Sequence, residues 1–279
     1  MNWAIMAFKN VIGFGVAGNF AGHLEQAGEA NDFLTVEVKE AVQPKAIFPF
    51  YVPSEKAGFL STYPLSTDTI TPPNEADNLQ IEPEVALLCD VEYEANKVVA
   101  LKPVKFAAYN DCSIRKPDAN KISEKKNWGA NTKGVSSQMF NLNGLSEGGE
   151  LDRYRIASFH QRANQVERYG EDSPVIGYSY FHEKLLNWMV ERMNNQQDVG
   201  PTENIAQHLA NANYPEQALI SIGATRYTEY GETTFLQSGD TSMVVVYDSQ
   251  KYSSHDIAAM AEKAEFPQEG ISALIQKVA

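Results

Sequence analysis

The pattern of apolar and polar positions predicts a chain that is mostly β-structured before residue 180. Runs rich in valine, alanine, leucine and phenylalanine at residues 85–91 and 98–109 predict strands. Further strands are expected at residues 11–12, 33–38, 153–160 and 242–247. Six prolines between residues 41 and 80 favour short strands and irregular turns in that segment.

Helical periodicity is clearest after residue 180. Phe181, Leu185, Met189 and Met193 recur every four residues and form one apolar stripe of a helix over residues 181–193. Further helices are expected at residues 19–26, 203–212, 255–263 and 271–278. Together the patterns predict an α+β fold with a small N-terminal subdomain over residues 1–60. A larger domain follows over residues 61–279, with a helical C-terminal extension from about residue 254.

Ionisable residues gather where predicted strands begin and end. Glu82 and Glu84 stand two apart at the start of an apolar run, so their side chains project to the same face of an extended strand. Asp111 follows the second apolar run. Three carboxylates repel one another in a site without water unless a cation lies between them, and they suit Mg²⁺, Mn²⁺ or Ca²⁺. A Glu-x-Glu sequence alone is also common at a solvated strand edge.

Six short segments extend this pattern along the chain. They are residues 19–23 (Asn-Phe-Ala-Gly-His), 82–84 (Glu-Pro-Glu), 110–115 (Asn-Asp-Cys-Ser-Ile-Arg), 128–134 (Trp-Gly-Ala-Asn-Thr-Lys-Gly), 221–225 (Ser-Ile-Gly-Ala-Thr) and 235–240 (Phe-Leu-Gln-Ser-Gly-Asp). In this order they resemble the motifs of the fumarylacetoacetate hydrolase (FAH) superfamily. The resemblance implies an FAH-like mixed β-sheet roll or sandwich with peripheral helices, and a homodimer.

The same resemblance implies roles for individual residues. Its metal ligands correspond to Glu82, Glu84 and Asp111. Lys133 would place positive charge at a developing oxyanion, and His23 would move protons or activate water.

Arg115 is expected to brace Asp111 or to bind the substrate carboxylate, and Thr225 is expected to bind the substrate. Gln26 stands where the family has a glutamate that holds the histidine, so it can orient the imidazole but cannot stabilise its charged form. Two further departures are Phe48 before Pro49, where relatives often have a lysine, and the altered segment at residues 222–226.

The activity implied by the resemblance is that of a divalent-metal-dependent enzyme. Its substrate would be a small anionic 2-oxo or 1,3-dioxo (acylpyruvate-like) acid, which reacts through an enolate. The sequence does not choose between C–C hydrolysis, decarboxylation and isomerisation. A catalytically impaired protein of the same fold that binds a metal or ligand is the alternative.

A competing interpretation comes from Gly13, Gly15 and Gly18, which form a G-x-G-x-x-G sequence with Glu37 downstream. Such glycines bring a helix close to the pyrophosphate of a dinucleotide in Rossmann folds. The preceding strand is short, however, and no regular alternation of strands and helices follows.

Charge and composition narrow the class of partner and compartment. The net charge of −13 argues against nucleic acid as a partner. Two cysteines and the lack of a long apolar run fit a cytoplasmic protein without a membrane span. A polar, lysine-rich segment at residues 116–133 is expected to be a loop, either solvated or closing over an anionic substrate.

Overall fold

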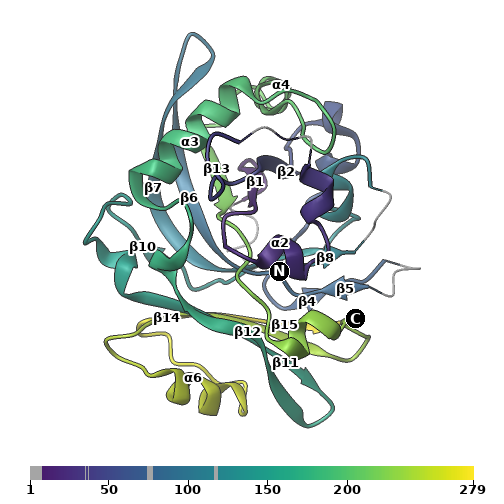
Figure 1. The fold of residues 1–279 in the computed structure, drawn as a ribbon, viewed down its shortest axis with the longest axis vertical. Coiled ribbons are helices and arrows are strands. Elements are labelled where there is room, and N and C mark those ends of the chain that lie inside the picture. The colour runs from purple at the N-terminus through teal and green to yellow at the C-terminus, as the bar shows by residue number, and fades with distance from the viewer. Residues whose placement is uncertain (1–7, 35, 37, 74–77, 116–118) are drawn as a thin grey trace.

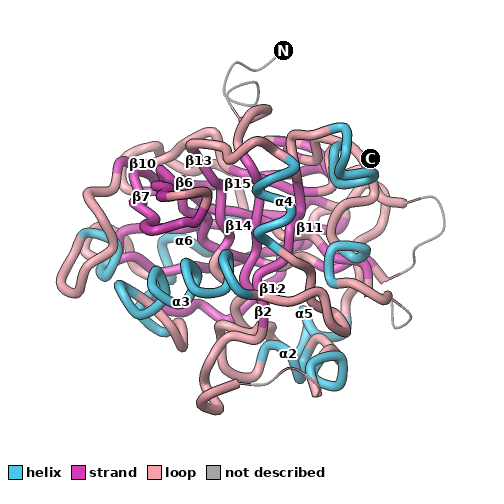
Figure 2. The backbone as a smooth tube through the Cα atoms, turned by 90° about the horizontal axis from the view of Figure 1, so that it is seen from above, coloured by secondary structure: helices cyan, strands magenta, loops and turns pink. Residues whose placement is uncertain are grey.

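Two β-sheets packed against each other form the body of the protein in the computed structural model, with helices at their outer surfaces (Figures 1 and 2). The structure describes residues 8–34, 36, 38–73, 78–115 and 119–279. The larger sheet runs in the order β2-β1-β13-β6-β7-β9-β3, with β10 also pairing with β7. The smaller sheet runs in the order β12-β11-β14-β15-β4, and β5 and β8 form a separate pair. This arrangement confirms the predicted α+β class.

The strands of the larger sheet are β1 (Ile12–Ala17), β2 (Ala46–Tyr51), β3 (Leu65–Ser66), β6 (Pro83–Glu94), β7 (Lys97–Asn110), β9 (Lys133–Val135), β10 (Phe140–Asn141) and β13 (Gln217–Ser221). Those of the smaller sheet are β4 (Thr69–Ile70), β11 (Tyr154–Arg162), β12 (Gln165–Pro174), β14 (Thr241–Asp248) and β15 (Ile271–Val278). The separate pair is β5 (Leu79–Gln80) and β8 (Ser113–Ile114). The helices are α2 (His23–Gln26), α3 (His182–Asn195), α4 (Ile205–Asn211), α5 (Glu229–Thr233) and α6 (Ser254–Ala261).

The β6–β7 hairpin is the scaffold on which the candidate site is built. Its two-residue turn, Ala95 and Asn96, has φ of 48° and 63°, as in the type I′ turns that match the twist of paired strands. From this turn the strands pair antiparallel until Pro83 lies opposite Asn110. The register therefore brings Glu82, just before β6, next to Asp111, just after β7.

Helix α3 confirms the predicted apolar stripe. Leu185, Met189 and Met193 are fully buried and join the core shared by both sheets. Helix α4 also lies where the sequence predicts a helix. Within the described residues, every helix is too short or too polar to cross a membrane.

The first two glycines of the G-x-G-x-x-G sequence make room for aromatic rings instead of a phosphate. A Cβ added to Gly13 or Gly15 on β1 would lie 2.2 Å from a ring carbon of Phe50 or Phe48 on β2. Since β2 is an edge strand, it also tolerates Pro49, which has no N–H to donate. The dinucleotide-binding prediction is therefore wrong for this fold; Glu37 lies outside the described residues.

Two expectations about secondary structure need correction. Residues 271–278 form strand β15 between β14 and β4, so the predicted C-terminal helical extension is limited to α6. The strand expected at residues 33–38 is absent from the part of it that is described, because Phe33 ends a 3-10 turn. A subdomain boundary near residue 60 would divide the larger sheet, since β1 and β2 before it lie in the same sheet as β6 after it.

Candidate metal and proton-transfer site

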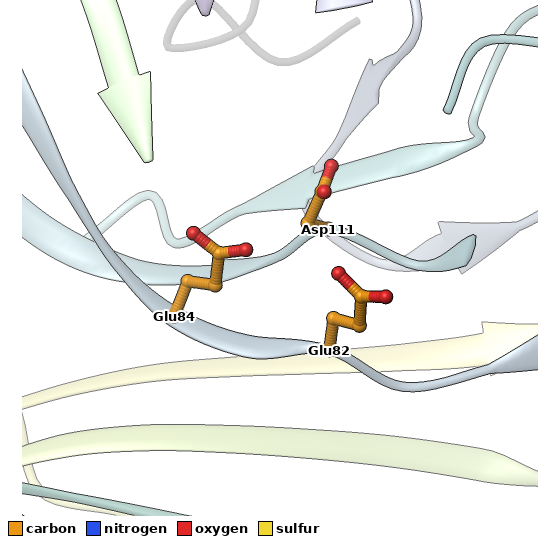
Figure 3. A group of neighbouring side chains, drawn as sticks. All are labelled: Glu82, Glu84 and Asp111. Carbon is orange, nitrogen blue, oxygen red and sulfur yellow. The ribbon is translucent and has the colours of Figure 1, made fainter. Parts of the chain in front are cut away.

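Three carboxylates converge at the open end of the β6–β7 hairpin (Figure 3). Glu82 and Glu84 flank the first residue of β6, and Asp111 follows β7, with its N–H donating to the Glu82 carbonyl at 3.0 Å. One carboxylate oxygen from each residue lies within 4.8 Å of the others, and all three side chains are buried. The predicted cluster is thus assembled by a single hairpin.

Lys126 lies between two of these carboxylates, which the sequence did not reveal. Its Nζ is 2.7 Å from Glu82 Oε2 and 2.7 Å from Asp111 Oδ2, and it donates to Ser113 Oγ at 2.6 Å. Its ammonium also lies 5.1 Å from the centre of the Phe48 ring. The lysine-rich segment is therefore not simply a solvated loop, because Lys125 and Lys126 are both buried. Residues 116–118 of that segment lie outside the described residues.

Lys133 contacts the cluster from the other side. Its Nζ is 3.3 Å from Asp111 Oδ1 and donates to the Cys112 carbonyl. The side chain is completely buried, and burial lowers its pKa although Asp111 opposes the shift. Lys133 therefore braces Asp111, whereas Lys126 faces the cavity described below.

The pKa values of Glu82 and Glu84 shift in opposite directions. Burial alone would raise the pKa of Glu82, but Lys126 and Arg115 hold that pKa well below its usual range. Burial, together with repulsion from Asp111 and Glu82, raises the pKa of Glu84 well above its usual range. Glu84 accepts a hydrogen bond from the Gly223 N–H at 2.7 Å. A cation near Glu84 would favour its charged form and so oppose the rise in pKa that burial and the two neighbouring carboxylates cause.

Arg115 braces Glu82, not Asp111. Its Nη1 lies 2.7 Å from Glu82 Oε1 and 2.9 Å from Glu29 Oε1. Its remaining nitrogens donate to the Gln80 amide oxygen at 2.5 Å and to the Tyr227 hydroxyl at 2.7 Å. These contacts use four of the five N–H groups of the guanidinium, so Arg115 acts mainly as a brace for Glu82 and has at most one N–H on Nη2 left for a substrate.

His23 is oriented by a backbone carbonyl. Its Nδ1 lies 2.9 Å from the Thr225 oxygen, which can only accept, so Nδ1 carries the proton and Nε2 is free to accept one. Burial lowers the pKa of His23 to about 4, although Glu82 opposes the shift. The imidazole is therefore neutral near pH 7. Thr225 acts here through its backbone, and its buried side chain does not line the cavity.

Gln26 is expected from the sequence to orient His23 by a hydrogen bond, but its side chain binds the backbone of Tyr227 instead. Its amide nitrogen donates to the Tyr227 carbonyl at 3.0 Å, and its oxygen accepts from the Tyr227 N–H at 2.9 Å. The same nitrogen lies 3.4 Å from Glu232 Oε2. Gln26 therefore fixes the backbone of the residue whose hydroxyl meets Arg115.

A small cavity of about 20 Å³ opens on this cluster. Its polar lining comprises His23, Glu29, Glu82, Glu84 and Lys126. Its other walls are mostly apolar and include Leu24, Phe33, Phe48 and Ile122. Glu29 and Lys126 are the charged lining residues that no sequence motif indicated.

Comparison with known proteins places this geometry in a context. A protein family described as a family of unknown function (DUF5718) matches residues 29–278. The chain belongs to this family. No curated protein matches the sequence.

Solved structures share the fold across most of their length. The protein Cg1458, crystallised with an inhibitor, is 14% identical over 96% of this chain and 76% of its own, with a TM-score of 0.56. 2-Keto-3-deoxy-D-arabinonate dehydratase is 13% identical over 96% of this chain and 72% of its own, with a TM-score of 0.53. A fumarylacetoacetate hydrolase family protein from Yersinia pestis CO92 is 10% identical over 96% and 94%, with a TM-score of 0.52. The FAH resemblance is thus confirmed for the fold.

Proposed function

We propose that this DUF5718 protein is a divalent-metal-dependent enzyme acting on a 2-oxo or 1,3-dioxo carboxylic acid through an enolate. The observation that carries the proposal is the buried convergence of Glu82, Glu84 and Asp111 beside a histidine and a lysine. The dehydratase of similar fold acts, by its name, on a 2-keto acid, which agrees with this substrate class.

The donor set fits a hard divalent cation. Three carboxylates offer oxygen ligands, and one atom from each lies within 4.8 Å of the others. Within the described residues, the partners of the Asp111 carboxylate are two ammonium groups, with Lys126 Nζ 2.7 Å from Oδ2 and Lys133 Nζ 3.3 Å from Oδ1. A cation at this position would share Glu82 and Asp111 with Lys126. When bound, it would polarise the substrate oxygens and stabilise the negative charge of an enolate.

The chain's own residues supply proton transfer and charge. His23, neutral and oriented through Nδ1, can take up a proton at Nε2 on the cavity side. Lys126, at the cavity wall, is the better candidate than Lys133 for stabilising an oxyanion. Burial would lower the pKa of Lys126, but Asp111 and Glu82 raise it, so the side chain stays charged.

The apolar walls indicate what the substrate carries besides its oxo-acid group. Leu24, Phe33, Phe48 and Ile122 form one small apolar cluster beside the carboxylates. Phe48 stands where relatives often have a lysine, so this wall is suited to an apolar substituent and not to a second carboxylate. We therefore expect an acylpyruvate-like acid with an apolar tail. The homodimer implied by the resemblance stays a prediction, which light scattering tests.

The test is turnover of apolar 2-oxo and 1,3-dioxo acids in the presence of Mg²⁺ or Mn²⁺, with Asp111→Asn as the inactive variant. We expect turnover that needs metal and that falls by about a hundredfold or more in Lys126→Met, as for loss of an oxyanion stabiliser. A broad screen without turnover, in a protein that still binds metal through Asp111, would contradict the enzymatic proposal.

A second candidate rests on the position of Lys126. Its ammonium already neutralises Glu82 and Asp111, and the cavity of about 20 Å³ is much smaller than an oxo acid. Both features favour a binding protein in which the lysine takes the place of the cation. Saturable oxalate binding that is independent of metal, without turnover, would support this candidate.

A further inference from the structure

A second cavity lies apart from the carboxylate site, against the C-terminal end of α3. Its volume is about 480 Å³, within the range of small-molecule sites. Val36, Val38, Lys39, Gln43 and Lys45 form one wall. The end of α3 with the following residues 196–202 forms the other. The described side chains that line it are all different from those that line the carboxylate site.

The charge of this cavity is opposite to that of the chain. The chain has 36 acidic and 23 basic residues, yet the charged residues that line the cavity are Lys39, Lys45 and Arg192. No carboxylate is among the described lining residues. A concave surface with one sign of charge concentrates ions of the other sign.

Three carboxylates that neighbour lining residues in the sequence form ion pairs with basic side chains. Glu40, next to Lys39, lies 2.6 Å from Lys184 Nζ. Asp198 lies 2.6 Å from Lys121 Nζ. Glu191 pairs with Arg192 at 2.5 Å through Nε, which offsets the charge of this guanidinium but does not engage its two terminal nitrogens. The excess positive charge of the described lining is therefore that of Lys39 and Lys45.

The polar wall between these cations is held rigid by hydrogen bonds. The buried Gln196 accepts from the Ile47 N–H at 2.9 Å and donates to the Ile47 carbonyl at 2.7 Å. Thr202 donates to the Gln197 carbonyl at 2.8 Å. Because these contacts are already made, an incoming ligand would order little of the wall.

We propose that this cavity is a binding site for a small oxyanion, of phosphate or carboxylate type, held by Lys45, Lys39 and the terminal nitrogens of Arg192. Guanidinium and ammonium groups form charge-assisted hydrogen bonds with both kinds of anion.

The experiment is calorimetric titration of the full chain with inorganic phosphate and, separately, with citrate. The double variant Lys45→Gln, Arg192→Gln removes two of the cations but keeps most of each aliphatic stem. The matched control is Lys97→Gln, Lys105→Gln, which changes the net charge equally at two exposed residues of β7.

We expect at least one anion to bind the wild type and the control equally, and to bind the cavity variant about tenfold or more weakly. Binding of phosphate alone or of citrate alone identifies the type of oxyanion. The proposal is overturned if neither anion binds the wild type, or if the cavity variant binds as tightly as the control. Asp111→Asn should leave this binding unchanged, which separates it from the carboxylate site.

Discussion

Replacing Lys126 by methionine tests whether its ammonium group and a bound metal occupy the same position between the carboxylates. In the absence of metal, Lys126→Met leaves Glu82 and Asp111, both nearly inaccessible, without the ammonium that lies 2.7 Å from each. Breaking a buried ion pair in this way costs about 3–5 kcal/mol. For a chain of this size that corresponds to a fall in Tm of about 6–20 °C.

Added metal should reverse this loss. A divalent cation at the three carboxylates supplies the charge that Lys126 supplied, and it no longer competes with the ammonium for Glu82 and Asp111. The rise in Tm caused by Mn²⁺, measured by scanning calorimetry against a chelator, should therefore be larger in Lys126→Met than in the wild type.

The neighbouring residue provides a matched control. Lys125 is as buried as Lys126, at 4% side-chain exposure each, but it pairs with Glu29 and Asp32 at 2.9 and 3.0 Å. Lys125→Met should lower Tm to a similar extent, yet its response to Mn²⁺ should equal that of the wild type. Equal Mn²⁺ responses in all three proteins would refute the idea that ammonium and metal share one position.

Two further substitutions test the surroundings of the site. Gln26→Glu should lower the free energy of unfolding by about 1–3 kcal/mol in urea titrations, because a carboxylate would face the Tyr227 carbonyl and Glu232; unchanged stability would contradict this. Burial raises the pKa of Glu203 from 4.5 to about 7, although the Ser123 hydroxyl opposes the shift. The folded state then binds more protons than the unfolded state, so the contribution of Glu203 to stability falls as pH rises from about 4.5 to 7. Glu203→Gln should therefore be more stable than the wild type at pH 8 by up to about 3 kcal/mol and similar to it at pH 4.5; a constant difference across pH would refute the assignment.

The carboxylate cluster could be predicted from the sequence because its geometry is local. Glu82 and Glu84 share a strand face by the two-residue repeat, and Asp111 is brought to them by antiparallel pairing of two neighbouring strands. The position of Lys126 depends instead on how an irregular segment folds back. A turn at residues 122–125 and hydrogen bonds from Lys121 and Ser123 to residues 198–203 set that path, and no short-range pattern encodes them.

Strand β15 shows why apolar periodicity misled at the C-terminus. Ile271, Leu274, Ile275 and Val278 follow the spacing of a helical stripe. The segment is nevertheless a strand inserted between β14 and β4, and its fully buried face consists of Ser272, Leu274, Gln276 and Val278. Because two of these four residues are polar, the sequence lacks the apolar alternation that is typical of a half-buried strand. Buried Gln276 fits this position because its oxygen accepts from Asn110 at 3.0 Å. Pairing with β14 and β4 therefore decides between a helix and a strand, which the sequence of this segment alone does not distinguish.

One segment of the chain, which contains Ile122 and Lys126, both lines the small cavity and holds the ammonium group against the carboxylates. An oxo acid needs far more than about 20 Å³, so the apolar cluster of Phe33, Phe48 and Ile122 must separate before a substrate can enter. Ile122 lies four residues before Lys126, and both belong to the segment that the contacts of Lys121 and Ser123 fasten to residues 198–203. Withdrawal of this segment would enlarge the cavity and remove the ammonium from Glu82 and Asp111 in one movement. Under the proposed function, entry of a substrate and access of a metal to the carboxylates would therefore be coupled, because one stretch of chain blocks both.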